Sequence, residues 1–176
     1  GKLGNAGIFN TTSIITIKNS SDYNYLVNGT NPFAFSFWMK RNNTANGAIL
    51  SDTNSEGYDL IVGTNINLRL AESTAKLDHY YSTPLVSDNY WHHYILSANG
   101  STILLYIDAI NYPIIGATYN PLNHTVNAPV YIGAGSGFFL NATLDEIMIF
   151  NRTLNQNEVL SLYEKNVQIV NKEAYY

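Results

Sequence analysis

Cysteine is absent from this chain of 176 residues, which excludes disulfide bonds and metal sites built from thiolates. Charged residues are also few, at 12% of the chain against a usual share of roughly 25%. The nine Lys and Arg residues form no basic run, so we do not expect nucleic acid as a partner. No apolar stretch approaches the roughly 18 residues that a membrane helix needs, so we expect no membrane insertion by this segment.

The remaining composition is that of a folded domain. Hydrophobic residues make up 45% of the chain and the formal net charge is only −4, whereas disordered chains combine low hydrophobicity with high charge. The length allows one domain with a sizeable core. We expect this domain to span residues 1–165, with residues 166–176 forming a tail or an added strand.

Alternating patterns typical of β-strands run along most of the chain. In FAFSFWMK, residues 33–40, the large apolar side chains share one face and Trp38 falls on the other. Residues 57–72 predict two strands about a turn at 63–65, and residues 91–108 predict a hairpin about Asn99-Gly100. Two more strands are expected within 129–135 and 142–150, and residues 71–88 are expected to form a long loop with at most a short strand. This succession indicates a sandwich or a barrel.

One helix is expected after Asn155. Asn155 is a typical N-cap residue and Glu158 stands three positions on, which is the arrangement of a capping box. Val159, Leu162 and Tyr163 then share one face at helical spacing, so the helix should pack through that face. The following NVQIVN has a weak period of two, which leaves a last strand and a linker as alternatives.

Asn-X-Ser/Thr triplets, the acceptor sequence for N-glycosylation, are more frequent than chance predicts. The chain has 24 Asn and 27 Ser and Thr residues, a composition that gives about four triplets by random placement, and it contains eight. Either the triplets are an accident of an Asn-rich composition, or the protein is glycosylated at the cell surface. The eight candidate asparagines are Asn10, Asn19, Asn28, Asn42, Asn99, Asn123, Asn141 and Asn151.

Candidate ligand contacts lie on the strand 33–40 and at the head of the hairpin. Trp38 offers a ring for stacking on a sugar, with core or loop packing as the alternative. Tyr90 and His92 are the other candidates. His92 and His93 are adjacent and should face opposite sides of a strand, so they are not the i, i+2 pair that a zinc site on a strand prefers.

The order of these segments resembles the laminin G-like, concanavalin A-like jelly rolls, in the cysteine-free form found in prokaryotic surface proteins. The matching segments are FAFSFWMK, WHHYILSANGSTILLYIDA, YIGAG and the closing ATLDEIMIFNRTL with its helix. The resemblance covers about residues 6–163 and implies an all-β jelly-roll sandwich of two antiparallel sheets with one short C-terminal helix. The hairpin would be a central pair, with Ile95, Leu104 and Ile107 among its buried residues.

The chain departs from the family pattern at glycines and acids. Asn10 and Thr11 stand where Asp-Gly is common, and Ala109 follows Asp108 where Gly is common. Because alanine tolerates a positive φ poorly, Ala109 predicts a different turn at that place.

The resemblance also implies a structural calcium ion. Calcium takes six to eight oxygen ligands, several of which backbone carbonyls can supply. Asp145 is the ligand that the family implies, with Asn10 as a neighbour and Asp88 at a rim position. A capping or hydrogen-bonding role without metal is the alternative for Asp145.

Catalysis is not expected. Laminarinase-type and lichenase-type enzymes of this fold carry Glu-X-Asp-X-X-Glu on one strand, which brings alternate carboxylates to one sugar bond. This chain has no such triplet, and the adjacent Asp145 and Glu146 should point to opposite faces of a strand. A glycoside hydrolase survives only as a remote alternative.

The resemblance and the triplets together predict a non-catalytic recognition or adhesion module of an extracellular, cell-surface protein. Its partner would be a glycan or another cell-surface protein. The alternative is a structural subunit or spacer of a glycosylated surface assembly. In that case the C-terminal tail would support self-assembly by adding to a neighbour's sheet edge.

Overall fold

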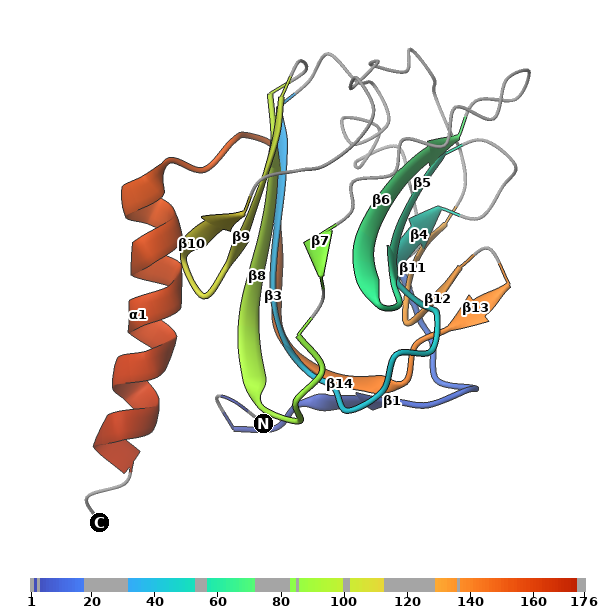
Figure 1. Cartoon of the computed structure of the whole chain (residues 1–176), viewed down its shortest axis with the longest axis horizontal. Coiled ribbons are helices and arrows are strands. Elements are labelled where there is room, and N and C mark those ends of the chain that lie inside the picture. Colours follow the sequence, from blue (N-terminus) through green and yellow to red (C-terminus); the bar gives the residue numbers. More distant parts are fainter. Residues whose placement is uncertain are drawn as a thin grey trace.

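A computed structural model describes residues 2, 4–17, 32–52, 57–71, 83–84, 86–99, 102–112, 129–135 and 137–173. Within these residues, two six-stranded antiparallel sheets face one another and a two-stranded hairpin lies beside them (Figure 1). The predicted jelly-roll sandwich of two antiparallel sheets with one helix is confirmed.

The first sheet, sheet A, has the strand order β1-β14-β3-β8-β9-β10. Its strands are β1 (Gly7–Phe9), β14 (Ala142–Phe150), β3 (Phe33–Lys40), β8 (Trp91–Ala98), β9 (Ile103–Ile107) and β10 (Ile110–Tyr112). The second, sheet B, has the order β2-β11-β4-β5-β6-β7. Its strands are β2 (Ile15–Ile17), β11 (Val130–Ile132), β4 (Gly47–Asp52), β5 (Gly57–Val62), β6 (Asn65–Ala71) and β7 (Thr83–Pro84). The small hairpin consists of β12 (Ala134–Gly135) and β13 (Phe138–Phe139).

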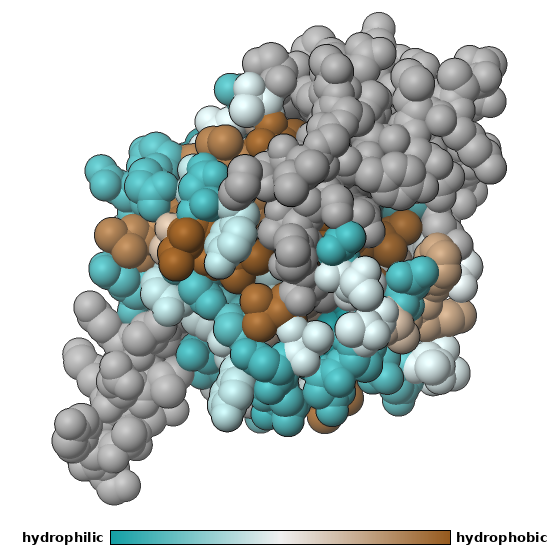
Figure 2. Space-filling view, in the orientation of Figure 1, coloured by the Kyte–Doolittle hydropathy of each residue, from teal (hydrophilic) through white to brown (hydrophobic). Residues whose placement is uncertain are grey.

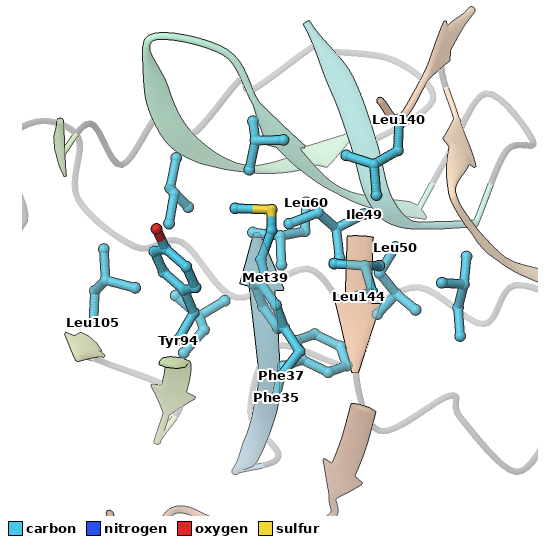
Figure 3. Packing of buried hydrophobic residues seen from close by; sticks show 14 of the residues in the cluster. Phe35, Phe37, Met39, Ile49, Leu50, Leu60, Tyr94, Leu105, Leu140 and Leu144 are labelled. Atoms are coloured by element: carbon cyan, nitrogen blue, oxygen red, sulfur yellow. The ribbon is translucent and has the colours of Figure 1, made fainter. Parts of the chain in front are cut away.

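Apolar side chains from both sheets fill the space between them (Figure 3). On β3, the alternation of FAFSFWMK sends Phe35, Phe37 and Met39 into this core, each no more than 3% exposed. Leu50 and Leu60 meet them from sheet B. Full burial of one such side chain contributes about 1.5–3 kcal/mol, so the β3 face is a major source of stability.

Helix α1 (Gln156–Glu173) lies on the outer face of sheet A, on the side away from sheet B (Figure 1). Its start is the predicted capping box. Oδ1 of Asn155 accepts hydrogen bonds from the backbone N–H groups of Asn157 and Glu158, at 3.0 and 3.1 Å. The Asn155 N–H donates to Oε2 of Glu158 at 2.9 Å. Val159 is fully buried in a cluster with Ile95 of β8, which confirms the predicted packing face.

Two sequence-based expectations near these elements need correction. Of the two alternatives for the segment after residue 165, the added strand is wrong, because residues 166–173 continue α1; helix propagation from a capped start outweighs the weak period of two. In the hairpin, Ile95 and Ile107 are buried as predicted, but Leu104 is 37% exposed. Leu104 pairs with Ser97 and therefore points to the outer side of sheet A.

The turn after β9 also differs from expectation, because it keeps the positive φ angles that a glycine would favour. Asp108 has φ 51° and Ala109 has φ 63°. Oδ1 of Asp108 accepts the His93 backbone N–H at 2.9 Å, and the Asp108 N–H donates to the His93 carbonyl at the same distance. Nε2 of Gln156 donates to the Ala109 carbonyl at 3.2 Å. These hydrogen bonds outweigh the preference of alanine for a negative φ.

The other predicted strands are confirmed where the structure describes them. β5 and β6 flank the expected turn at residues 63–65, and β7 is the short strand allowed within residues 71–88. Residues 72–82 and 85 of that predicted loop lie outside the described residues. In the described part of the chain, no helix combines the length and the apolar character needed to span a membrane.

Candidate ligand-binding site

A row of paired residues crosses sheet A from β1 through β14 and β3 to β8. The register pairs Ile8 of β1 with Thr143 of β14, and Thr143 with Lys40 of β3. Lys40 is in turn paired with Trp91 of β8. Because Met39 points into the core, the neighbouring Lys40 and its partners point outward. Ile8 is 76% exposed, while Lys40 and Trp91 are half-buried.

A pocket of about 220 Å³ lies at this row, and we call it the amide pocket. Its wall combines three asparagines, a threonine and two cations with a few apolar residues. The lining residues are Ile8, Phe9, Lys40, Arg41, Asn42, Asn89, Asn141, Ala142 and Thr143. Figure 2 shows that the lower end of the molecule is mostly hydrophilic on the face in view.

Hydrogen bonds hold the segments that carry the asparagines. The backbone N–H of Asn89, a residue with φ 68°, donates to the Arg41 carbonyl at 2.9 Å. Asparagine is among the residues that tolerate this left-handed conformation best. Nδ2 of Asn43 donates to the Asn141 carbonyl at 2.8 Å. Because both bonds join segments far apart in the sequence, the pocket wall is organised without a ligand, which reduces the cost of binding.

Arg41 is a buried cation in this wall, with 4% of its surface exposed. Its Nε and Nη2 atoms donate to Oδ1 of Asn43 at 3.3 and 3.1 Å, and Nη2 also donates to the Ala45 carbonyl. Nη1 has no hydrogen-bond partner among the described residues. Burial lowers the pKa of Arg41, and nearby Tyr94 acts in the opposite direction. Among the described residues, all the hydrogen-bond acceptors of the guanidinium group are therefore neutral.

His92 lies between two carboxylates, so its ring is already occupied. Nδ1 of His92 is 2.6 Å from Oδ2 of Asp108, and Nε2 is 3.1 Å from Oδ1 of Asp88. Asp88 also accepts the Tyr90 backbone N–H at 2.9 Å, and this bond, followed by the one to His92, lowers the pKa of Asp88. The Tyr90 side chain is 71% exposed. Of the two predicted hairpin contacts, Tyr90 is therefore the one open to a ligand.

Trp38 lies under helix α1 with 1% of its surface exposed. Its ring stacks on His93 and on Tyr163, with centroids 5.0 and 5.8 Å apart, and Nζ of Lys2 lies 4.3 Å from its centroid. No sugar can reach this ring while α1 is in place, so the packing alternative describes Trp38 in this structure. The neighbouring His93 is 2.8 Å from Oγ of Ser36, and burial lowers its pKa to about 4.

The three calcium candidates lie in separate hydrogen-bond networks. Asp145 accepts two backbone N–H bonds at 2.7 and 3.0 Å, and Asp88 contacts His92 as described above. Asn10 accepts hydrogen bonds from the residues two and three positions further on, at 2.9–3.2 Å. Across the described ranges, no three His, Asp or Glu side chains are grouped so that they could hold a metal ion. A calcium site at these residues therefore stays a prediction.

The glycosylation triplets within the described residues all begin at exposed asparagines. These are Asn10, Asn42, Asn99, Asn141 and Asn151. The other three, Asn19, Asn28 and Asn123, lie outside the described residues. Two of the exposed asparagines, Asn42 and Asn141, also line the amide pocket.

A second depression, of about 240 Å³, lies between β2, β11 and the β12–β13 hairpin, and we call it the apolar groove. Phe138 and Phe139 are 37% and 46% exposed there. Its lining residues are Ile14, Tyr131, Ala134, Gly135, Gly137, Phe138 and Phe139. The hairpin packs closely on β4, because a Cβ added at Gly135 would lie 2.2 Å from the Cβ of Ser51.

The amide pocket was not predicted from the sequence. Asn42 and Asn141 were candidates only for glycosylation, and Lys40, Asn89 and Thr143 were assigned no role. Polar residues at the ends of predicted strands could be seen in the sequence, but such residues are common there and do not mark a pocket. The pocket also depends on the order β1-β14-β3-β8, which joins residues more than a hundred positions apart.

Several known structures share this fold. The chain is similar to the binding domain of botulinum neurotoxin DC in complex with rat synaptotagmin II, with TM-score 0.67 and 14% identity. The same domain in complex with SialylT gives TM-score 0.66 and 13% identity. Each match covers 93% of this chain, which spans less than half of those domains, 46% and 45%.

A third similar structure is domain 4 of AbnA, a GH43 extracellular arabinanase from Geobacillus stearothermophilus, in complex with arabinotriose. It has TM-score 0.67 and 19% identity, over 93% of this chain and 78% of that one. No curated protein matches the sequence. Residues 9–160 match the family described as the concanavalin A-like lectin/glucanases superfamily. Since this match covers most of the sequence, the chain belongs to that superfamily.

Proposed function

We propose that the chain is a non-catalytic recognition module that binds glycan at the amide pocket. The observation that carries the proposal is the wall of the pocket, which presents three asparagines, Thr143 and Lys40. Amide groups donate and accept hydrogen bonds, as sugar hydroxyls do, so several such groups around one pocket suit a sugar ring. Trp91, half-buried on the adjoining strand, adds an aromatic surface beside it.

The similar structures support a binding role. One is a complex with arabinotriose, one with SialylT and one with synaptotagmin II. The lining of the amide pocket contains no Asp or Glu among the described residues. Glycoside hydrolysis generally needs a pair of carboxyl groups that flank the scissile bond. This composition favours binding over cleavage.

We place the module outside the cell, on the cell surface. The five exposed asparagines that begin triplets support this location, and the arabinanase with a similar domain is described as extracellular. Calcium stays a prediction that the fold family motivates. Asp145, Asp88 and Asn10 are its candidates, and removal of divalent ions with EDTA tests it independently of the amide pocket.

The proposed function is tested with a glycan array, probed with and without EDTA and followed by titration with the best ligand. A double variant, Asn42→Ala with Asn141→Ala, should bind about tenfold more weakly, because two hydrogen bonds contribute about 0.5–1.5 kcal/mol each. The matched control is Asn5→Ala with Asn111→Ala, two exposed asparagines that do not line the pocket. An array on which no glycan binds would refute the proposal. Equal affinity of the two double variants would refute the assigned site.

A protein partner is the second candidate, and the apolar groove is the observation that favours it. Exposed Phe138 and Phe139 beside Ile14 suit apolar side chains of a protein better than sugar hydroxyls. Phe138→Ser with Phe139→Ser should abolish capture of a protein partner and leave glycan binding intact. Loss of glycan binding in this variant would move the glycan site from sheet A to the apolar groove.

One argument for the alternative function, a structural subunit of a surface assembly, no longer holds. It assumed that the tail adds a strand to a neighbour, but residues 166–173 are helical. Self-assembly through these residues is tested by light scattering on the full chain and on a chain that ends at residue 165. A monomer in both cases would exclude this route.

A further inference from the structure

We infer that the amide pocket selects a sugar that carries a carboxylate group. This inference rests on the proposed glycan-binding function and specifies the class of glycan. The observation behind it is a pair of adjacent cations, Lys40 and Arg41, for which the described residues supply no anion.

Lys40 is the accessible cation of the pair. It is half-buried in the row Thr143–Lys40–Trp91 on the outer face of sheet A. Among the described residues, no carboxylate forms an ion pair with it. The other polar side chains of the wall are neutral amides and a hydroxyl. An ammonium group in such surroundings attracts an anion without competition from a fixed partner.

The buried Arg41 adds a second positive charge to the wall of the amide pocket. Charged side chains that are buried as completely as Arg41 are normally paired with an opposite charge, because desolvation of an unpaired charge is costly. Here the guanidinium donates to Asn43 and to the Ala45 carbonyl, both neutral, and Nη1 is left without a partner among the described residues. A ligand carboxylate in the pocket would provide the missing negative charge.

The two carboxylates on either side of His92 are already engaged. Asp88 precedes Asn89 and holds both His92 and the Tyr90 N–H. Asp108 holds His92 and the His93 N–H. The chain as a whole carries a net charge of −4, so a wall with two cations and no acid is a local exception. Electrostatic complementarity of this kind determines selectivity more than total affinity.

A carboxylate on a sugar fits the lining better than a free anion does. The cations can pair with the carboxylate, while Asn42, Asn89 and Asn141 remain for the hydroxyl groups of the ring. A bare anion would leave these amides without partners. We therefore expect recognition to require both the charge and the sugar ring.

Two matched pairs of ligands test the inference by calorimetric titration. The first pair is trigalacturonate and its methyl ester, which share one skeleton and differ in charge. The second pair is sialyllactose and lactose. The acidic member of at least one pair should bind about three- to tenfold more tightly, and this preference should shrink as salt rises. Sulfated lactose serves as a further probe, and binding as tight as that of the carboxylate would overturn the selectivity for carboxylate.

Lys40→Gln should remove most of the preference for the acidic member over the neutral member of each pair. Lys165→Gln is the matched control, because it makes the same change of charge at an exposed position on α1. Lys40→Arg should restore the preference. If Lys165→Gln has the same effect as Lys40→Gln, the effect is one of net charge and the inference fails.

The inference and the proposed function fail in different ways. If neutral glycans bind on the array and neither acidic probe is preferred, the recognition module stands and its selectivity for acids is refuted. If no glycan of any kind binds, both are refuted.

Discussion

The indole ring of Trp38 and the phenol ring of Tyr163 stack with centroids 5.8 Å apart and planes inclined by 16°. One ring belongs to the outer face of sheet A and the other to helix α1, so the contact joins the C-terminal helix to the sandwich. His93 extends the stack, with its ring centroid 6.2 Å from that of Tyr163. The stability of α1 and the concealment of Trp38 are therefore coupled.

Tyr163→Ala should lower the free energy of unfolding by about 1–2 kcal/mol, because it removes an aromatic stack and uncovers apolar surface of Trp38. Hydrogen exchange of α1 should accelerate more than that of β3. Chemical denaturation and exchange mass spectrometry measure the two effects. Tyr90→Ala, at a 71% exposed position, is the matched control and should change stability by less than about 0.5 kcal/mol. Equal effects of the two variants would show that the stack does not fasten the helix.

Burial of His93 makes stability depend on pH. Burial lowers its pKa from 6.5 to about 4, and Asp108 opposes the shift only in part. Between about pH 4 and pH 6.5, His93 therefore carries a proton in the unfolded chain but not in the folded chain. The stability due to the neutral ring is therefore complete above about pH 6.5 and falls as the pH decreases, by about 3 kcal/mol near pH 4.

The measurement that checks this is urea denaturation at several values between pH 7 and pH 4. Carboxylates also titrate near the lower limit, so the comparison is with His93→Gln, which keeps a polar group beside Ser36. The difference in unfolding free energy between wild type and variant should shrink as the pH falls. A difference that is constant with pH would show that His93 is not the titrating group.

Ala109→Gly should raise the free energy of unfolding by about 1 kcal/mol. Ala109 has φ 63°, a conformation that costs non-glycine residues about 1–2 kcal/mol, and the greater freedom of glycine in the unfolded chain offsets part of the gain. Thermal and urea denaturation measure the change. Ala45→Gly, at an exposed position without a positive φ, should instead lose about 0.5–1 kcal/mol. Destabilisation at both positions would contradict the described turn.

Glycans attached at Asn42 or Asn141 should compete with a ligand for the amide pocket, because both asparagines line it. Protein from a host that performs N-glycosylation should therefore bind the array ligand more weakly than protein from a host that does not. Mass spectrometry of the glycopeptides measures occupancy at each triplet. Thr44→Ala removes the triplet at Asn42 and should recover part of the binding. Asn99→Gln and Asn151→Gln remove triplets outside the pocket and should recover none.

Much of the fold could be predicted from local patterns. The alternation in FAFSFWMK identified the core face of β3, and the capping box located the start of α1. The destination of Trp38 could not be predicted, because periodicity assigns a side chain to a face but does not say what covers that face. Ala109 illustrates the same limit, since long-range bonds from His93 and Gln156 decide the conformation of its turn.

The amide pocket could not be predicted from the sequence for a related reason. Its residues are at strand ends, where polar side chains are common and carry no special pattern. Ile8, Lys40 and Thr143 become neighbours only through the register of three strands that are distant in the chain. The exposed asparagines were recognisable as glycosylation triplets, but the triplet motif says nothing about a shared wall.

The placement of the two tryptophans gives the protein two separate fluorescent reporters. Trp38 is sealed beneath α1 and should emit at short wavelength until the helix detaches. Trp91 is half-buried and pairs with Lys40, which lines the amide pocket, so its emission should respond to an arriving ligand. Single Trp→Phe variants would separate the two signals, so that occupation of the pocket and release of the helix could be followed in one cuvette without any added dye.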